Sequence, residues 1–136
     1  MHPRGDRVRT LCLDFDGVLH THNGPYEGET IIRGTPVPGA VAFVEAALGT
    51  FDAVVVHSAR CRSAEGRRAI TLWLTDHGFP MDLAVVADKP PAIVYLDDRA
   101  VTFTGVFPDP GALAAFLPWD RTADLAQSDM RPVGSP

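Results

Sequence analysis

Residues 11–19 read Leu11-Cys12-Leu13-Asp14-Phe15-Asp16-Gly17-Val18-Leu19, and this stretch decides the fold of the chain. An apolar run ends in two aspartates one residue apart, and a glycine follows at once. A run without polar alternation indicates a buried strand of a parallel sheet. Two carboxylates at its end are costly unless a bound cation compensates them. Gly17 permits a tight turn and allows its backbone N–H to approach an anion.

Two simpler interpretations of Asp14 and Asp16 exist. Asp-x-Asp-Gly also opens calcium loops, but such a loop needs a ligand at the next alternate position and a glutamate at its end. Val18 and Pro25 occupy these positions, so a calcium loop is excluded. The other alternative is a plain strand-to-turn junction, because Asp and Gly are ordinary turn residues.

Composition restricts the class of protein. The chain has 136 residues, of which 46% are hydrophobic, which suits one globular domain and excludes disorder. No apolar run has membrane-spanning length, and residues 1–10 do not resemble a secretory signal. Cys12 and Cys61 form no Cys-x-x-Cys pair, so we expect a reducing, cytoplasmic location. The net charge of −5 gives no overall attraction to nucleic acid.

Strand and helix patterns alternate along the chain. Strands are predicted over 8–14, 51–57, 83–86, 92–96 and 101–107, and helices over 38–48, 63–77 and 109–117. Alternation of this kind indicates an α/β fold with a mainly parallel sheet of about five strands. Residues 87–91 are too few for a helical crossover, so the place of the third strand stays open. We expect one domain over 1–118, with a flap at 18–37 and a loose tail at 119–136.

Polar side chains follow several of the predicted strands. Ligands of doubly wound sheets bind beyond the carboxyl ends of the strands, so these side chains should gather at one edge. They are Asp14 and Asp16 after the first strand, Ser58 after the second, Lys89 before the fourth, and Asp97 and Asp98 after it. Lys89 is also the only lysine in the chain, which suggests that a compact ammonium is needed there.

These residues resemble the motifs of the haloacid dehalogenase-like superfamily of phosphohydrolases over about Val8 to Phe107. The first motif is Asp14-Phe15-Asp16-Gly17-Val18, and the others are Ser58, Lys89 and Asp97-Asp98. The resemblance implies Mg²⁺ and a phospho-aspartyl intermediate. It implies that Asp14 is nucleophile and metal ligand, and that Asp16 is general acid/base with its backbone carbonyl on the metal. It further implies that Ser58 binds the phosphoryl oxygens, that Lys89 offsets charge, and that Asp97 and Asp98 hold the metal.

The chemistry agrees with this resemblance. Phosphoryl transfer depends mainly on positioning and electrostatic stabilisation. A carboxylate can act as nucleophile beside a cation, and an all-oxygen ligand set suits Mg²⁺ better than zinc. Asp16 could protonate the leaving oxygen and later deprotonate water. Because no long segment separates the motifs, we expect a Rossmann-like, doubly wound member without a cap domain.

Arginines suggest how a substrate is held. Arg60 and Arg62, with Arg67 and Arg68, follow Ser58 and could form a basic rim, although charge runs are usually solvated. Asp97-Asp98-Arg99 and the lack of a cap resemble the 3′-phosphatase half of phage polynucleotide kinases. Gly17, Arg60, Arg62 and Arg99 are therefore candidate substrate-binding residues, and nucleic-acid 3′-phosphate ends are one candidate substrate.

Other functions stay open. A small-metabolite or nucleotide phosphatase closed by a partner subunit fits the same residues, as does a catalytically idle binding module. We expect no membrane association and either a monomer or a homodimer. His20 and His22 have no cysteine or third histidine nearby, so they are interpreted as solvated or substrate-contacting flap residues, and His57 as structural.

Overall fold

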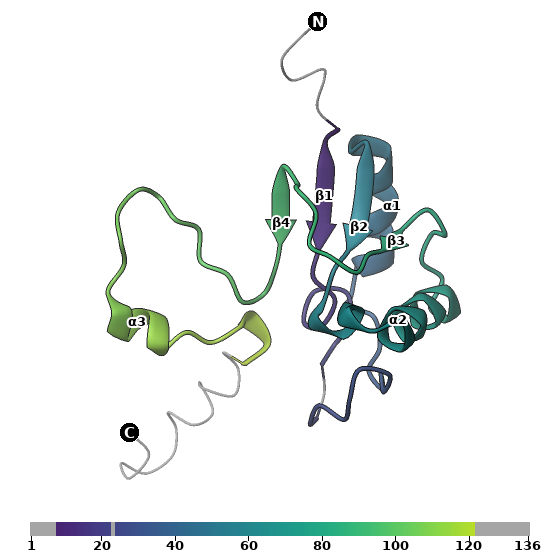
Figure 1. The fold of residues 1–136 in the computed structure, drawn as a ribbon, viewed down its shortest axis with the longest axis horizontal. Coiled ribbons are helices and arrows are strands. Elements are labelled where there is room, and N and C mark those ends of the chain that lie inside the picture. Colours follow the sequence, from purple (N-terminus) through teal and green to yellow (C-terminus); the bar gives the residue numbers. More distant parts are fainter. Residues whose placement is uncertain (1–7, 23, 122–136) are drawn as a thin grey trace, which may run out of the picture. The chain divides into compact units, whose positions relative to one another are not determined.

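The computed structural model describes residues 8–22 and 24–121 (Figure 1). The strands are β1 (Thr10–Leu13), β2 (Ala53–Val56), β3 (Ala84–Val85) and β4 (Val94–Leu96). The α-helices are α1 (Ala40–Thr50), α2 (Ala64–Asp76) and α3 (Pro110–Ala114), and the 3₁₀ turns are η1 (Ala59–Arg62) and η2 (Trp119–Arg121). The chain divides between Asp97 and Asp98 into two compact units, and the first contains the whole sheet with α1 and α2.

The strands form one parallel sheet, which confirms the predicted α/β class. Among the described residues the sheet has four strands in the order β3-β2-β1-β4. Leu11 of β1 pairs with Val54 on one side and with Val94 on the other. The chain therefore adds strands in one direction from β1 to β3 and then places β4 on the opposite side of β1. The carboxyl ends of β1 and β4 meet at this reversal, where ligands of open α/β sheets bind.

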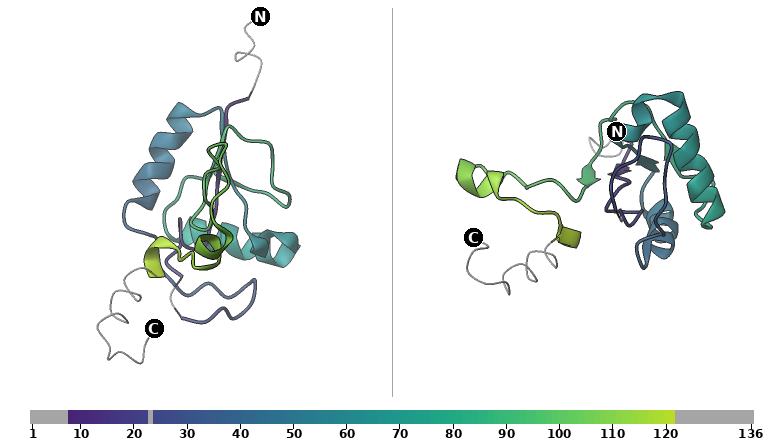
Figure 2. Two further views of the ribbon diagram at one scale, coloured as in Figure 1. Left: turned by 90° about the vertical axis from the view of Figure 1, so that its left-hand side faces the viewer. Right: turned by 90° about the horizontal axis from the view of Figure 1, so that it is seen from below.

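The core lies on one face of the two central strands. Leu11 and Leu13 of β1 alternate with Thr10 and Cys12, and they share a face with Val54 and Val56 of β2. α1 and α2 flank the sheet, and Figure 2 shows both helices from two further sides. They contribute the buried residues Val44 and Ala47 from α1 and Ile70, Trp73 and Leu74 from α2.

Each of α2 and α3 begins one residue after the first residue of its predicted range, and that first residue caps the helix. Ser63 accepts a hydrogen bond from the Gly66 backbone N–H at 3.0 Å, and Asp109 accepts one from Ala112 at 3.0 Å. α1 extends to Thr50, two residues beyond the predicted end at 48. The last helix is shorter than expected and ends at Ala114.

The predicted fifth strand is not present. Residues 101–107, all within the described part of the chain, form no strand. Gly105 and Pro108 disfavour a strand here, and a β-propensity pattern alone does not supply a neighbouring strand to pair with. The predicted tail at 119–136 begins with η2, and its residues 122–136 lie outside the described part of the chain.

The third strand does join the parallel sheet, although no helix follows it. Residues 86–93, the crossing segment, lead from β3 at one edge of the sheet to β4 at the other, and Figure 1 shows this segment passing across β2 and β1. Its ends are fixed by backbone bonds from Val86 to the Val56 carbonyl at 3.0 Å and from Ile93 to the Thr10 carbonyl at 2.9 Å. The connection between β3 and β4 is too short to contain a helix, so it crosses the sheet without one.

The flap at 18–37 is a loop closed at its base by backbone bonds. Thr21 donates to the Thr35 carbonyl at 2.9 Å, and Val37 donates to the Leu19 carbonyl at 2.8 Å. The flap lies at the end of the sheet to which the strand arrows point in Figure 1. Within the described residues, no helix has the length and apolar character that a membrane span requires.

The packing of α2 predicts where stability resides. Ile70 is fully buried, and Leu72 on the same helix is 57% exposed. We expect Ile70→Ala to lower the free energy of unfolding by about 3 kcal/mol, because it removes buried methyl groups and leaves a cavity. Leu72→Ala is the matched control and should change it by less than about 0.5 kcal/mol. Urea denaturation measures both, and equal losses would contradict this placement of the core.

Candidate active site

Three carboxylates meet at the ends of β1 and β4. Carboxylate oxygens of Asp14, Asp97 and Asp98 lie within 4.8 Å of one another. Asp14 follows β1, the other two follow β4, and the Asp14 backbone N–H donates to the Leu96 carbonyl at 2.9 Å. Neighbouring parallel strands end at the same edge of the sheet. The fold therefore brings Asp14 close to Asp97 and Asp98, which follow it by 83 and 84 positions in the sequence.

The three carboxylates fit a hard divalent cation. Carboxylates this close repel one another, and a cation between them offsets that repulsion. The Asp98 Oδ1 atom is buried and has no hydrogen-bond partner among the described residues. A buried oxygen of this kind is costly unless it is satisfied, and oxygen donors are the ligands that Mg²⁺ and Ca²⁺ prefer. These side chains could therefore bind a metal ion, and its identity stays a prediction.

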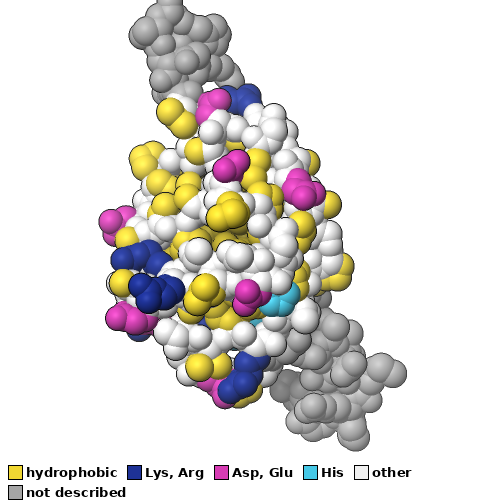
Figure 3. Space-filling view, turned by 90° about the vertical axis from the view of Figure 1, so that its right-hand side faces the viewer, with side chains coloured by type: hydrophobic (Ala, Val, Ile, Leu, Met, Phe, Trp, Pro, Cys, Tyr) yellow, Lys and Arg dark blue, Asp and Glu magenta, His cyan; other side chains and the backbone are white. Residues whose placement is uncertain are grey.

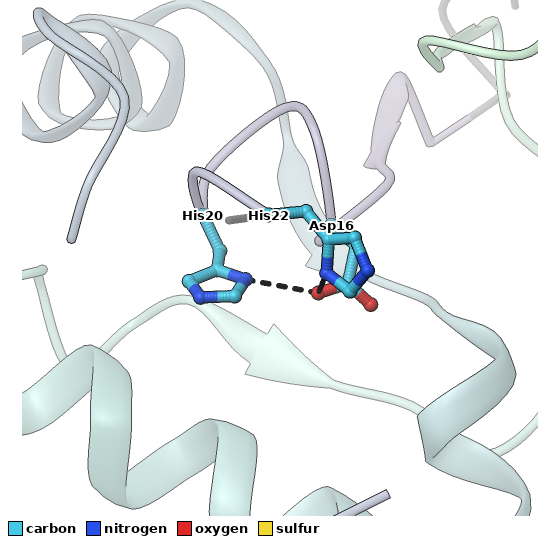
Figure 4. A group of neighbouring side chains, drawn as sticks. All are labelled: Asp16, His20 and His22. Carbon is cyan, nitrogen blue, oxygen red and sulfur yellow. Dashed lines mark hydrogen bonds and ion pairs between the residues drawn. The ribbon is translucent and has the colours of Figure 1, made fainter. Parts of the chain in front are cut away.

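Asp16 has a different environment from Asp14. Its carboxylate accepts two bonds from Arg60, from Nε to Oδ2 at 2.8 Å and from Nη2 to Oδ1 at 3.2 Å. Its Oδ1 atom also accepts a bond from His20 Nδ1 at 2.9 Å, which Figure 4 shows together with the contact from His22. Burial would raise the pKa of Asp16, but the bonds from His20 and Arg60 and the Arg60 charge outweigh it and lower the pKa to about 2.

His20 is buried, so the prediction of a solvated side chain is wrong for this residue, and contact with a substrate stays a prediction. Its side chain is 3% exposed, stacks on Phe15 with ring centroids 5.2 Å apart, and meets the edge of Trp73. The Gly34 backbone N–H donates to His20 Nε2 at 2.9 Å. Nε2 therefore carries a lone pair, and Nδ1 carries the proton that is donated to Asp16.

Gly34 makes this bond possible. A Cβ atom at this position would lie 2.0 Å from the Thr21 carbonyl oxygen and 2.6 Å from His20 Nε2. No side chain fits there without moving backbone, so only glycine can bring its N–H this close to the imidazole. The sequence analysis named His20 but did not predict its bond to Asp16, and it did not identify Gly34. The only local signal of the bond is the spacing of four positions between Asp16 and His20.

Asp16, His20 and His22 also lie close enough for a metal ion. The hydrogen bonds disfavour such a site, because a ligating nitrogen must be free of its proton. His20 Nδ1 donates its proton to Asp16 Oδ1, and both Asp16 oxygens already accept hydrogen bonds from Arg60. This group is a hydrogen-bond network, and the three-carboxylate cluster has the better donor chemistry for a metal.

Arg60, predicted to bind substrate, is almost fully buried at 2% exposure. Its Nη1 atom donates to three carbonyl oxygens of the flap, and the guanidinium carbon lies 5.0 Å from the centroid of the Tyr26 ring. These carbonyls belong to Gly28, Glu29 and Ile31, at 2.9, 3.1 and 3.0 Å. Arg60 thus joins the flap to Asp16, and any contact with substrate stays a prediction.

Ser58 and Gly17 occupy the predicted turns. Ser58 is buried two residues after the end of β2, and its hydroxyl oxygen accepts from the Arg60 backbone N–H at 3.1 Å. Gly17 has a φ of 85°, which explains the glycine, and its backbone N–H donates to the His20 carbonyl at 2.8 Å. Binding of a phosphoryl group by Ser58 or by Gly17 stays a prediction.

Lys89 lies in the crossing segment, next to Tyr95 of the edge strand β4. Its ammonium is 4.4 Å from the centroid of the Tyr95 ring. Burial raises the pKa of the Cys12 thiol, and the positive charge of Lys89 acts on that pKa in the opposite direction. The Lys89 charge therefore acts on the β1 residue two positions before Asp14, and its action on Asp14 stays a prediction.

The remaining arginines do not form a continuous basic rim. Arg62 is exposed and pairs with Glu29 at 2.6 Å, and Arg67 donates to the Cys61 carbonyl at 2.7 Å. Figure 3 shows basic side chains lying next to acidic ones on one face of the molecule. Arg99 directly follows Asp98 in the second unit, and its side chain or backbone takes part in an interaction there. Substrate binding by Arg62 and Arg99 stays a prediction.

Comparison with known proteins found no matching family, no similar curated protein and no similar solved structure. The geometry of the site is therefore the only basis for assigning a function. It offers a carboxylate cluster suited to a hard cation, a second carboxylate held by a buried arginine, and an ammonium beside the first strand. This arrangement can bind and polarise an anionic oxygen ligand such as a phosphate ester.

The pKa of Asp16 predicts how acid affects stability. A folded pKa of about 2 lies below the ordinary value of 3.8, so the ionised carboxylate stabilises the fold above about pH 4. We expect Asp16→Asn to lower the free energy of unfolding of the metal-free protein by about 2 kcal/mol near neutral pH.

That difference from wild type should shrink as the pH falls from 4 toward 2, because wild-type Asp16 then becomes neutral too. Urea denaturation at several pH values measures it. Asp82→Asn, at an exposed aspartate before β3, is the control for loss of a negative charge. A pH-independent difference would show that the Asp16 charge does not stabilise the fold.

Proposed function

We propose that this protein is a Mg²⁺-dependent phosphatase that acts through a phospho-aspartyl intermediate on Asp14. The observation that carries the proposal is the cluster of Asp14, Asp97 and Asp98, with its buried and unpaired Asp98 oxygen, where β1 and β4 end side by side. Carboxylates at this edge of a parallel sheet fit a cation and the phosphate ester that it would bind.

Asp14 is the nucleophile in this proposal. One of its carboxylate oxygens attacks phosphorus, and the bond from phosphorus to the ester oxygen of the leaving group breaks. Asp97 and Asp98 would hold Mg²⁺ together with Asp14 and the Asp16 backbone carbonyl. When bound, the metal offsets negative charge on the phosphoryl oxygens. Lys89 offsets the same charge from the crossing segment, and Ser58 binds a phosphoryl oxygen.

Asp16 moves the proton. It gives a proton to the leaving oxygen, and it later takes one from the water that attacks phosphorus and releases Asp14. The low pKa of Asp16 suits the second step, in which it acts as a base. For the first step the carboxylate must be protonated, and a bound phosphate favours this because its negative charge raises the pKa of a carboxylate nearby.

The proposal extends to the fold and the substrate class. We place the chain with the Rossmann-like, doubly wound phosphohydrolases that lack a cap domain, because the flap at 18–37 is a short loop. A site without a cap admits the end of a large substrate, so nucleic-acid 3′-phosphate ends are our first substrate class, and nucleotides or small metabolites are the second. We propose action in the cytoplasm, as a monomer or a homodimer.

Asp14→Asn tests the reaction class. We expect the wild-type chain to release phosphate from an aryl phosphate only with Mg²⁺, and the variant to lose turnover by at least about a thousandfold, because an amide is a poor nucleophile. Phosphate release is measured by colorimetry over a substrate panel of 3′-phosphorylated oligonucleotides, mononucleotides and sugar phosphates.

Asp82→Asn is the matched control for that variant and should retain wild-type turnover, since it lies at an exposed position before β3. A wild-type chain without activity on any phosphate ester would indicate the idle binding module. Retained turnover in Asp14→Asn would instead exclude the covalent mechanism.

Lys89→Arg tests the role of the ammonium. We expect kcat to fall at least about tenfold, or about 1.4 kcal/mol, because a planar guanidinium directs its charge differently from a compact ammonium. Steady-state kinetics with the aryl phosphate measures the change, and thermal unfolding checks the fold. A kcat within about twofold of wild type would mean that Lys89 is a solvated charge.

A further inference from the structure

Tyr95 contacts the crossing segment at two points. The Lys89 ammonium lies 4.4 Å from the centroid of its ring, and its hydroxyl donates to the Pro90 carbonyl oxygen at 2.6 Å. A cation over the face of an aromatic ring is attracted by the ring quadrupole. One side chain of β4 therefore holds both the charge of Lys89 and the backbone next to it.

The register of the sheet relates Tyr95 to the carboxylates. Tyr95 on β4 pairs with Cys12 on β1, so the two side chains share a face of the sheet. Asp14 and Asp97 each follow two positions later, one residue beyond the end of β1 or β4, and their carboxylates lie close together there. Tyr95, which holds the Lys89 ammonium, is therefore two positions before Asp97 and pairs with the residue two positions before Asp14.

Lysine needs such a contact more than most residues. Its four-carbon stem has many rotamers, and Lys89 is exposed in a segment without helix or strand structure. Without a contact such as the Tyr95 ring, its ammonium would lie beside the carboxylate cluster for only part of the time. The tyrosine ring restricts it before any substrate binds, which reduces the ordering that the reaction would otherwise require.

We propose that Tyr95 is a positioning residue that holds the only lysine of the chain, through its ring face, beside the carboxylate cluster. The part of this inference that concerns turnover rests on the proposed phosphatase function. The contact itself does not, and the two are tested by separate measurements on the full 136-residue chain.

The first measurement is chemical modification of Lys89, which needs no activity. Because the chain has one lysine, acylation of its ε-amine by N-hydroxysuccinimidyl acetate can be followed on a single peptide by mass spectrometry. We expect Tyr95→Leu and Tyr95→Met to raise the rate of acylation about threefold or more, because the ring no longer covers and stabilises the ammonium.

Two further variants separate the ring from its surroundings. Tyr95→Phe keeps the ring and loses the bond to Pro90, so acylation should stay within about twofold of wild type. Val94→Ala changes the neighbouring residue of the same strand, whose side chain points to the other face, and it is the control for loosening β4. A rate that rises equally in Val94→Ala, or in none of the variants, would overturn the proposal.

The second measurement is a double-mutant cycle on kcat for an aryl phosphate. We expect Tyr95→Leu to lower kcat about fivefold in the wild-type background, with KM changed by less than about twofold. In a Lys89→Ala background the same change should have almost no effect, because there is no ammonium left to position. An equal loss in both backgrounds would mean that the ring acts only on the fold.

The two measurements distinguish the ways in which the proposals can fail. If acylation responds as expected but no phosphate ester is hydrolysed by wild type, the contact stands and the phosphatase function is wrong. If phosphatase activity is present but neither acylation nor kcat responds to loss of the ring, the function stands and the positioning role of Tyr95 is wrong.

Discussion

The buried ion pair between Arg60 and Asp16 is the interaction on which the rest of the site depends. A guanidinium at 2% exposure is tolerated only if its donors are satisfied, and Arg60 bonds both carboxylate oxygens and three flap carbonyls. Removing one partner of such a pair leaves a costly buried charge. The flap, the turn after β1 and the segment after β2 are therefore held in one arrangement by one side chain.

This constraint gives two neighbouring aspartates different environments. Asp14 faces the carboxylates that follow β4, and Asp16 faces Arg60 and His20. The tautomer of His20, set by the Gly34 N–H, directs its proton to Asp16. Both Asp16 oxygens are therefore engaged by Arg60 and His20, whereas an Asp14 oxygen lies within 4.8 Å of oxygens of Asp97 and Asp98. In the mechanism that we propose, carboxylates in different environments would supply the nucleophile and the acid/base.

The connection from β3 to β4 has a comparable effect on the other side of the site. A helical crossover would have covered the sheet with apolar side chains, but residues 86–93 cross it as an extended segment that carries Lys89. Tyr95 on β4 then meets that segment from the sheet. The same short connection that made the topology hard to predict brings the only lysine of the chain near the first strand.

Local patterns in the sequence determined the strands β1 and β2 and the start of α2, because apolar runs and helix caps depend on only a few neighbouring residues. They also predicted that Asp14, Asp97 and Asp98 lie close together, because parallel strands end at a common edge of the sheet. Only the tertiary structure decided the burial of Arg60 and His20, the absence of a fifth strand and the path of the crossing segment. Arg60 and Gly34 look like surface arginine and loop glycine in the sequence, since their partners lie far along the chain. Contacts of that range depend on how the flap folds back onto the sheet, which no local pattern records.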